Sequence, residues 1–514
     1  MAPLAQQQIP PVNSTASPSW RKANGYWTRE CAGGEQAVSY NQNIRDGHTE
    51  LTVELPFSIN ISTTELIQRV RNAWLVSHSM YPEIAIQIST DTELPQMMKY
   101  EALETEADAA SWLQETFHLV TDQTACDVAS MTYSRRLPTK GKRNMLYLVT
   151  APAANPENPT SHCLVRNMSH VLADAYSIVQ FFNFFFSTVT KVPGDCDFTF
   201  SDLDYSNVLG RLPVTPVTPY QEQYKPTNQQ KQQAINNALS QAELYASKMP
   251  QSITMYPSSS ATTRSHKTHC IRLQYTLSES QTLLSFLRTQ NLSITFAAAA
   301  ATILAVKQTY SKGHETGALL GMTRNAQRWV DTTSHREKGS SVPNAADVVF
   351  LWIQFQPEWF GGSMSTGDTI LSIARAIKSE LGPHLSSPHY LSSLSFTSDK
   401  FISSLIAEGE EPTPAPCAPG FSPQGALALD HKIQSRDVSI TTHDFVHTGR
   451  QINASPWVGM FSLWERVTLS IGFDGKYYEP ETMEGFMGRV KGNLGRLAEE
   501  SGRGLMEEKA RAKL

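Results

Sequence analysis

A histidine and an aspartate stand four residues apart in the middle of residues 163–186. This segment begins with an apolar run typical of a buried strand, continues through His170 and Asp174, and ends in a strongly apolar helix. An imidazole changes its charge near neutral pH, so histidine is well suited to acid–base chemistry there. A histidine between a strand and a helix is held by two rigid elements, as catalytic groups require. This segment is therefore the first candidate for a catalytic site.

The spacing alone is weak evidence, because the chain contains a second His-x-x-x-Asp pair. With 14 histidines and aspartate at roughly one position in twenty, about 0.7 matches are expected by chance. The second pair, His118 and Asp122, follows a charged helical segment and leads into a polar stretch with no second element to hold the histidine. We take His170 as functional and His118 as a chance match. The alternative for His170 is a core histidine whose hydrogen bonds are satisfied.

The elements around His170 alternate between strands and helices. Residues 144–150 and 162–168 predict consecutive strands joined by a Pro/Asn-rich loop, and the second strand leads to His170. The Phe-rich run after Asp174 predicts the core face of a helix. Further strands are predicted at 51–57, 268–276, 317–323, 346–355 and 467–474, and helices at 62–74, 103–117, 278–287, 293–306 and 481–500. This alternation indicates α/β layers.

A chain of 514 residues is too long for one ordinary core, which indicates two or three domains. Residues 1–19 predict a disordered lead-in, and 20–200 a first subdomain that carries the His-x-x-x-Asp pair. Residues 201–265 are rich in Pro, Thr, Gln and Asn and predict a crossover with a helix over 228–247. Residues 266–514 predict the second subdomain.

Composition excludes several classes of protein. A net charge of −5 provides no basic surface for nucleic acid or anionic membrane. No run reaches the roughly 18 apolar residues of a membrane span, and the N-terminus has no signal-peptide pattern. Six scattered cysteines without a Cys-x-x-Cys pair favour a reducing compartment. A cytoplasmic location is expected, with a peroxisomal one as the alternative, because the terminal Ala512-Lys513-Leu514 resembles a peroxisomal address.

Other catalytic and binding patterns are missing from the sequence. There is no Gly-x-Ser-x-Gly elbow, so an ordinary α/β-hydrolase is excluded. Gly361-Gly362 lacks the strand–loop–helix context of a phosphate-binding loop. The histidine pairs 266/269 and 443/447 lack a partnered acidic or cysteine set, so no metal site is expected.

The order of these segments resembles the His-x-x-x-Asp acyltransferases, the superfamily of chloramphenicol acetyltransferase, peptide-synthetase condensation domains and plant BAHD enzymes. More narrowly, the chain resembles fungal secondary-metabolite O-acyltransferases of the trichothecene 15-O-acetyltransferase kind. The resemblance covers roughly residues 50–500. It rests on the strands that end at Ser169-His170-Val-Leu-Ala-Asp174, the small-residue helix from Ser293, the Thr-Arg324 segment, Phe421-Ser-Pro-Gln-Gly425, Asp444-Phe445 and the closing strand at 467–474.

The resemblance implies two similar α/β subdomains with mixed sheets, flanking helices and a tunnel between them, with the histidine at its middle. His170 would take the proton from an acceptor hydroxyl or amine as it attacks an acyl thioester, a contribution of typically ~10²–10⁴-fold. Asp174 would turn away from substrate and pair with an arginine, Arg324 being the first candidate and Arg328 the second. Ser422 is a candidate donor to the developing oxyanion, the alternative being a turn serine before Pro423.

The implied activity is an acyl-CoA-dependent O-acyltransferase, with acetyl-CoA as the expected co-substrate and no bound cofactor. The expected partners are this acyl donor and a small-molecule alcohol or amine, for a monomer acting on a fungal terpenoid or polyketide. Two alternatives stay open: a carrier-protein-bound donor, or a binding or cyclisation protein that has lost acyl transfer. Ser169 and Ala175 replace the His and Gly of the commoner motif, and Asp444–Gly449 only approaches the plant Asp-Phe-Gly-Trp-Gly motif.

Overall fold

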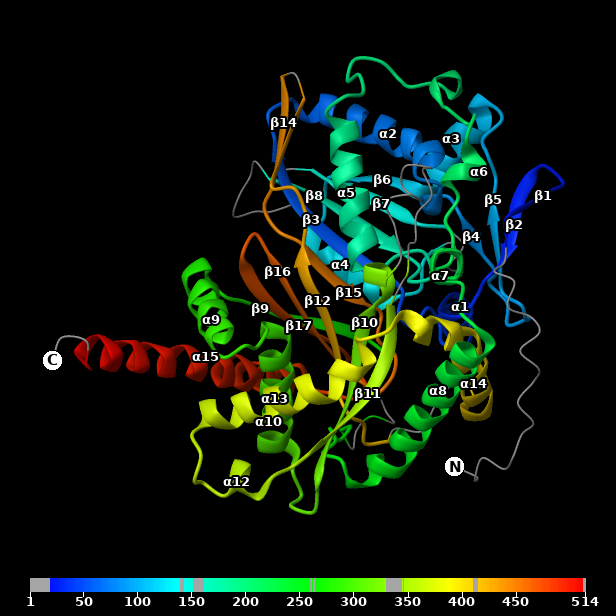
Figure 1. Ribbon diagram of the computed structural model, residues 1–514. Coiled ribbons are helices and arrows are strands. Elements are labelled where there is room, and N and C mark those ends of the chain that lie inside the picture. The colour runs from blue at the N-terminus through cyan, green and yellow to red at the C-terminus, as the bar shows by residue number, and fades with distance from the viewer. Residues whose placement is uncertain are drawn as a thin grey trace.

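The structure is a computed structural model that describes residues 19–138, 143–150, 161–258, 261, 264–329, 344, 346–409, 415–435 and 437–511. It contains two α/β halves, each built on a mixed sheet with helices packed against it (Figure 1). The predicted α/β class is confirmed. All but the last residue of the predicted lead-in, 1–19, lies outside the described residues.

The first half is built on a seven-stranded sheet in which the order along the main path is β13-β14-β3-β8-β7-β6, with β15 also paired to β3. The predicted consecutive strands are an antiparallel pair, and β8 also pairs antiparallel with β3. The strands from the first part of the chain are β3 (Leu51–Ile59), β6 (Phe117–Val120), β7 (Met145–Val149) and β8 (His162–Met168).

Helix α5 (Ala175–Val189) follows β8 and fills the core of this half. Phe181, Phe182, Phe185 and Phe186 are fully buried, and Trp74 of α2 (Thr63–Met80) meets two of these rings edge-on. A buried aromatic ring removes a large apolar area from water, so this cluster fixes α5 firmly on the sheet. The Phe-rich run is therefore core, as predicted, and it anchors the helix that begins beside His170.

The second half is built on a six-stranded sheet with the order β11-β10-β12-β16-β17-β9. Ala297–Ala301 of α10 have no exposed surface, and small side chains allow close approach of α13 and α15. The strands are β9 (Thr268–Gln274), β10 (Gly317–Asn325), β11 (Ala346–Gln354), β12 (Gly420–Leu427), β16 (Trp457–Leu463) and β17 (Arg466–Asp474). The covering helices are α9 (Leu277–Thr289), α10 (Ile294–Tyr310), α13 (Thr366–His384) and α15 (Pro480–Arg511).

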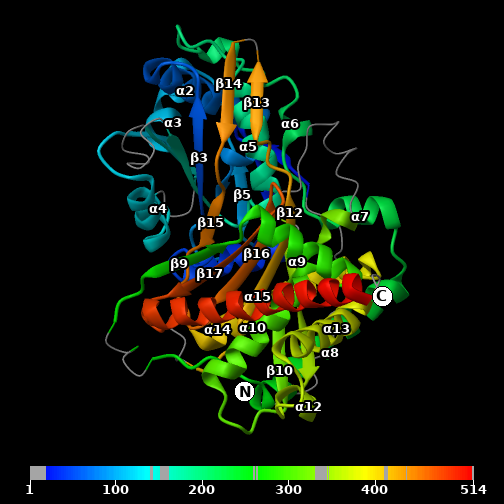
Figure 2. The ribbon, with the colours of Figure 1, turned by 90° about the vertical axis from the view of Figure 1, so that its left-hand side faces the viewer.

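Three strands from late in the sequence return to the first sheet, which corrects the predicted boundary of the second subdomain. They are β13 (Lys432–Ser435), β14 (Val438–Thr442) and β15 (Val446–Gly449). Strands β14 and β15 pair with successive parts of β3. Figure 2 shows the orange β13 and β14 beside the blue β3. Residues 266–514 are thus not one structural unit, because 432–449 complete the sheet that carries His170.

The remaining elements form the ends and the crossover. Near the N-terminus, β1 and β2 join β4 and β5 in a four-stranded antiparallel sheet. The predicted crossover helix is α8. These elements are β1 (Arg21–Ala23), β2 (Tyr26–Glu30), β4 (Gln87–Ile88), β5 (Met97–Tyr100), α1 (Gly34–Ile44), α3 (Glu106–Thr116), α4 (Ala125–Ser134), α6 (Val208–Arg211), α7 (Val217–Tyr224), α8 (Asn228–Lys248), α12 (Pro357–Phe360) and α14 (Leu394–Glu408).

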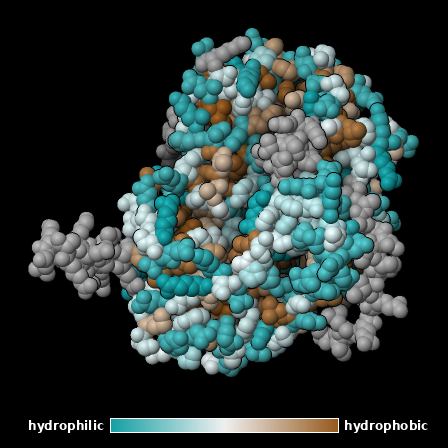
Figure 3. Space-filling model, viewed as in Figure 1, coloured by the Kyte–Doolittle hydropathy of each residue, from teal (hydrophilic) through white to brown (hydrophobic). Residues whose placement is uncertain are grey.

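Hydrophilic residues dominate the face of the molecule seen in Figure 3, where hydrophobic residues form only small patches. Within the described residues, no single helix is long and apolar enough to cross a membrane. One bent pair, Leu277–Thr289 with Ile294–Tyr310, passes the test by length and composition, but the Ala-rich part of the second helix is buried against α13 and α15.

Burial of a carboxyl between the halves makes stability depend on pH. Glu54 of β3 stands opposite Val446, and burial raises its pKa from 4.5 to about 7, against the lowering effect of Arg272. The folded protein therefore holds a proton that the unfolded chain has lost between pH 4.5 and about 7, so stability falls as pH rises through this window. Between low and high pH, the unfolding free energy of Glu54→Gln should therefore fall by up to about 3 kcal/mol less than that of wild type.

Urea unfolding of wild type and Glu54→Gln at about pH 5 and about pH 8 measures the difference. Burial also raises the pKa of Glu50 to about 7, and Glu50 contributes the same pH-dependent loss of stability in both proteins. The exposed Glu93→Gln serves as the control and should leave the fall unchanged. An equal fall in wild type and Glu54→Gln would show that Glu54 does not titrate in this window.

Candidate functional site

His170 lies in the turn between β8 and α5, where the sequence places it, and its side chain is partly buried. Asn344, just before β11 of the second half, donates from Nδ2 to the His170 carbonyl oxygen at 2.6 Å. The same Nδ2 lies 3.5 Å from Nδ1 of the imidazole. His170 is thus held by its own half through β8 and α5, and by the other half through Asn344. Nδ1 faces Asn344, which leaves Nε2 for a substrate.

His118 lies on β6, opposite Tyr147 of β7, and the two rings stack at 5.1 Å. The expectation that no second element holds His118 is wrong, because His118 lies on β6 and α4 begins soon after it, at Ala125. Burial lowers the pKa of its imidazole. The second pair therefore belongs to the edge of the sheet, whereas the first lies where the halves meet.

Asp174 begins α5 as its N-terminal cap. Its Oδ1 accepts from the Ser177 amide at 2.9 Å, and Ser177 Oγ accepts from the Asp174 amide at 2.8 Å. This reciprocal pair satisfies backbone donors that a helix start leaves open. The other carboxylate oxygen, Oδ2, lies 3.4 Å from Nε2 of Gln327 in the second half. Asp174 thus fixes the helix that follows His170.

The predicted ion pair between Asp174 and Arg324 is wrong. The Arg324 guanidinium pairs with Asp347 at 2.7 Å and stacks on Tyr390, with 3.5 Å from its central carbon to the ring centroid. The reason is strand register: Arg324 on β10 stands directly opposite Asp347 on β11, so the cross-strand carboxylate is its nearest partner. The second choice also fails, since Arg328 donates to the Leu385 carbonyl.

We expect Asp174→Ala to lower both stability and rate. Losing a buried cap should reduce the free energy of unfolding by roughly 1–2 kcal/mol and loosen the turn that carries His170. Asp174→Asn should lose less stability, because its amide oxygen can still accept from the Ser177 amide. The asparagine NH₂ group would face the donor Nε2 of Gln327, however, and would lose that contact. Urea unfolding and initial rates measure the two effects.

The matched control for Asp174 is Thr276→Ala, which removes the cap of α9 on the outside of the second half. It should lower stability by about 1 kcal/mol and leave the rate unchanged. If Asp174→Ala keeps the wild-type rate, Asp174 has only the ordinary role of a helix cap.

Ser422 lies within β12 and pairs with Gly459 of β16, so the alternative of a turn serine is wrong. Its Oγ accepts from Thr323 Oγ1 at 3.2 Å. Because a serine hydroxyl has one proton and two lone pairs, accepting from Thr323 leaves the Ser422 proton available for another acceptor. A β-bulge follows between Pro423 and Gly425.

Gly425 brings β12 against α5. The Tyr176 hydroxyl of α5 would lie only 3.1 Å from a Cβ at this position, and the backbone has a φ of +68°, which favours glycine. Burial raises the pKa of this hydroxyl, against the lowering effect of the Asn325 side chain. The β12 bulge therefore packs against the first turn of α5, the helix that follows His170.

Sequence reasoning overlooked one histidine of the site, His447. It lies on β15, between Phe445 and Phe461, whose ring centroids are 5.2 and 5.4 Å from its own. Nε2 of Gln424, in the β12 bulge, lies 2.6 Å from Nε2 of His447. The sequence shows only that Asp444–Gly449 approaches the plant Asp-Phe-Gly-Trp-Gly motif, and Asp444 pairs with both terminal nitrogens of Arg272.

His447 is held neutral. Burial lowers its pKa to about 4, and the positive charges of Arg272 and of protonated His170 act in the same direction. Its partner Gln424 lies on β12, two residues from Ser422, and β12 contacts α5, the helix that follows His170.

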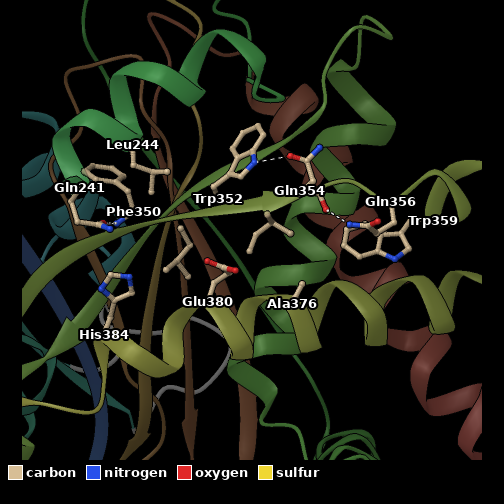
Figure 4. Close-up of a pocket in the computed structure, with 12 residues that line it drawn as sticks. Gln241, Leu244, Phe350, Trp352, Gln354, Gln356, Trp359, Ala376, Glu380 and His384 are labelled. Carbon is tan, nitrogen blue, oxygen red and sulfur yellow. Dashed lines mark hydrogen bonds between the residues drawn. The ribbon is translucent and has the colours of Figure 1, made fainter. Parts of the chain in front are cut away.

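A separate cavity of about 410 Å³ lies between α8, β11 and α13 (Figure 4). Phe350 and Trp352 of β11, Trp359, Glu380 and His384 are among its lining residues. None of the predicted site residues lines it, although the His384 carbonyl accepts from Arg324. This cavity is on the outer edge strand of the second sheet and is distinct from the His170 site.

No group of three or more histidine, cysteine or acidic side chains arranged for a metal ion occurs in the part of the chain that the structure describes. Contrary to the sequence reading, His266 does have an acidic partner, since its Nδ1 lies 2.5 Å from Asp474. His269 instead stacks on Phe473.

A comparison with models of known protein families gives no match. Among individual proteins, the chain is 34% identical to the acyl-CoA-dependent acyltransferase MAC1 of Pseudozyma antarctica, over 90% of this chain and 93% of that protein. It is also 34% identical to MAC1 of Mycosarcoma maydis, over 90% of this chain and 86% of that protein.

Among solved structures, the trichothecene 15-O-acetyltransferase TRI3 of Fusarium sporotrichioides has a TM-score of 0.77 at 15% identity, covering 94% of this chain and 98% of that one. The condensation domain of the polyketide synthase MokA has a TM-score of 0.58 at 10% identity, covering 93% and 98%. At these identities the likeness shows the fold. By sequence and fold together, the chain belongs to the family of acyl-CoA-dependent acyltransferases, built on the fold of chloramphenicol acetyltransferase and condensation domains.

Proposed function

We propose that this acyltransferase transfers an acyl group, acetyl in the first instance, from acyl-CoA to a hydroxyl of a small fungal secondary metabolite such as a terpenoid or polyketide. His170 is the general base. The observation that carries the proposal is the placement of His170 where the two halves meet, held by Asn344 from the second half.

In this mechanism the His170 imidazole takes the proton of the acceptor hydroxyl as its oxygen attacks the thioester carbon. A carbon–oxygen bond forms, and the carbonyl oxygen gains negative charge that Ser422 can stabilise by donating its free proton. When the intermediate collapses, the carbon–sulfur bond breaks, and the proton held by His170 passes to the leaving thiolate. The products are the ester and free CoA, and His170 returns to its neutral state.

The residues around the imidazole support this role through position. Asp174 fixes the start of α5, and Tyr176 and Gly425 join that helix to β12, the strand that carries Ser422. A base and an oxyanion donor on rigid elements can hold the reacting atoms in one geometry. The tunnel implied by the resemblance is the expected route for the two substrates, which would enter between the halves of a monomer.

Release of free CoA thiol tests the proposal. Purified protein is given acetyl-CoA, hexanoyl-CoA or palmitoyl-CoA, with and without a panel of polyhydroxylated terpenoid and polyketide alcohols. We expect thiol release that depends on an alcohol and is fastest with the shortest donor, together with the acetyl ester by mass spectrometry. If thiol release is fastest with hexanoyl-CoA or palmitoyl-CoA, the enzyme transfers longer acyl chains and not acetyl groups.

If no acyl-CoA donor gives alcohol-dependent thiol release, CoA is not the acyl donor of this enzyme. The same panel with an acyl group on a phosphopantetheinylated carrier protein would then identify a carrier-bound donor. Failure with both kinds of donor would favour the alternative of a binding or cyclisation protein.

A further inference from the structure

Two buried polar atoms beside the site have no hydrogen-bond partner among the described residues: Nδ1 of His447 and Oε1 of Gln424. The two side chains contact each other through their other ends, with 2.6 Å between Nε2 of Gln424 and Nε2 of His447. An amide nitrogen can only donate, so Nε2 of the neutral imidazole accepts and Nδ1 carries the proton. The pair therefore presents one unpaired donor, Nδ1–H, and one unpaired acceptor, Oε1.

The pair joins the two halves of the molecule close to His170. His447 lies on β15, which pairs with β3 of the first sheet, and Gln424 lies on β12 of the second. Gly425, the next residue, lies under Tyr176 in the first turn of α5. Gln424 is also two residues from Ser422. The unpaired atoms thus lie among the elements that position the reacting groups.

The chemistry of the two atoms narrows the class of ligand. A buried donor or acceptor without a partner destabilises the protein unless a water or a ligand pairs with it. The thioester carbonyl of an acyl donor can only accept, and an acyl chain can do neither. A hydroxyl group both donates and accepts, so a hydroxyl-bearing acceptor can satisfy both atoms. The amide and hydroxyl groups of CoA could do the same, and the KM for acetyl-CoA distinguishes the two.

We propose that His447 and Gln424 form a polar subsite that binds hydroxyl groups of the acceptor other than the one that is acylated. The pair thereby sets a preference for polyhydroxylated acceptors. This inference rests on the proposed O-acyltransferase function. Sites that hydrogen-bond a substrate hydroxyl discriminate strongly against analogues without it, because their own buried groups are then left unpaired.

The test compares two acceptors that differ by one hydroxyl, octane-1,2-diol and octan-1-ol, with acetyl-CoA as donor. His447→Phe keeps an aromatic ring between Phe445 and Phe461, and Gln424→Leu keeps the side-chain volume. In wild type, kcat/KM should be higher for the diol. In each variant the ratio of kcat/KM for diol to mono-ol should fall by about 10–100-fold, while KM for acetyl-CoA stays constant.

His162→Phe is the matched control, because it removes a buried imidazole from the opposite end of β8, where His162 contacts Phe57. It should keep the wild-type ratio. An unchanged ratio in both site variants would overturn the subsite, since a buried water would then satisfy the two atoms. An equal loss of kcat/KM for diol and mono-ol would also overturn it and leave the pair a purely structural role.

A binding measurement separates this inference from the proposed function. If wild type releases no thiol with any alcohol, the acyl-transfer proposal fails, and thermal stabilisation by each alcohol alone decides the subsite. Greater stabilisation of wild type by the diol, lost in either folded variant, supports it. Equal stabilisation by diol and mono-ol contradicts it.

Discussion

His170→Ala is expected to reduce alcohol-dependent thiol release by about 10²–10⁴-fold, the usual contribution of a general base. The loss should fall on kcat, because the imidazole acts on the proton transferred during attack and not on binding of acyl-CoA. The side chain is partly exposed and lies in a turn, so the free energy of unfolding should change by less than about 1 kcal/mol. Initial rates and urea unfolding on the same preparations measure both.

His118→Ala is the control for this variant. His118 has the same His-x-x-x-Asp spacing, but its ring packs on Tyr147 at the edge of the first sheet. This variant should keep the wild-type rate even if stacking is lost. Normal turnover by His170→Ala would contradict the mechanism, and a loss in both variants would show that the measurement reports folding.

Ser422→Ala is expected to reduce kcat by about 10²–10³-fold, as removal of an oxyanion donor does in other acyl-transfer enzymes. Thr323 already donates to the Ser422 oxygen, so the serine proton is directed elsewhere. The interaction strengthens only when negative charge develops, and KM should therefore change little. The kcat and KM values of this variant decide between an oxyanion donor and a structural serine of β12.

Ser398→Ala is the matched control for Ser422, because it removes a buried serine hydroxyl from α14. It should leave kcat unchanged. Thr323→Val gives a finer test: without the donor that orients Ser422, kcat should fall by less than in Ser422→Ala. A wild-type kcat in Ser422→Ala would assign oxyanion stabilisation to other donors.

The turn that carries His170 could be predicted because its determinants are local. The short apolar runs at 144–150 and 162–168, bounded by polar and Pro-rich segments, predict strands, and Asp174 begins a helix through its own contacts with Ser177. The resemblance to acyltransferases rested on the order of such segments, and the related proteins confirm the family.

The partner of Arg324 could not be predicted, because it depends on strand register. A sequence shows two cations near Thr323 but not that Arg324 stands opposite Asp347. Similarly, the assignment of residues 266–514 to one unit failed because β14 and β15 pair with β3, almost 400 residues earlier. Such long-range pairing leaves no periodic signal in the chain.

The sequence by itself determined the α/β class, the positions of most strands and helices, and the His170–Asp174 segment, since hydrophobic period and helix caps act within a few residues. Only the tertiary structure decided which side chains surround that segment. Asn344, Gln424 and His447 come from three separate segments of the chain. The pairing of β15 with β3 and the contact between α5 and β12 bring these segments to the His170 site.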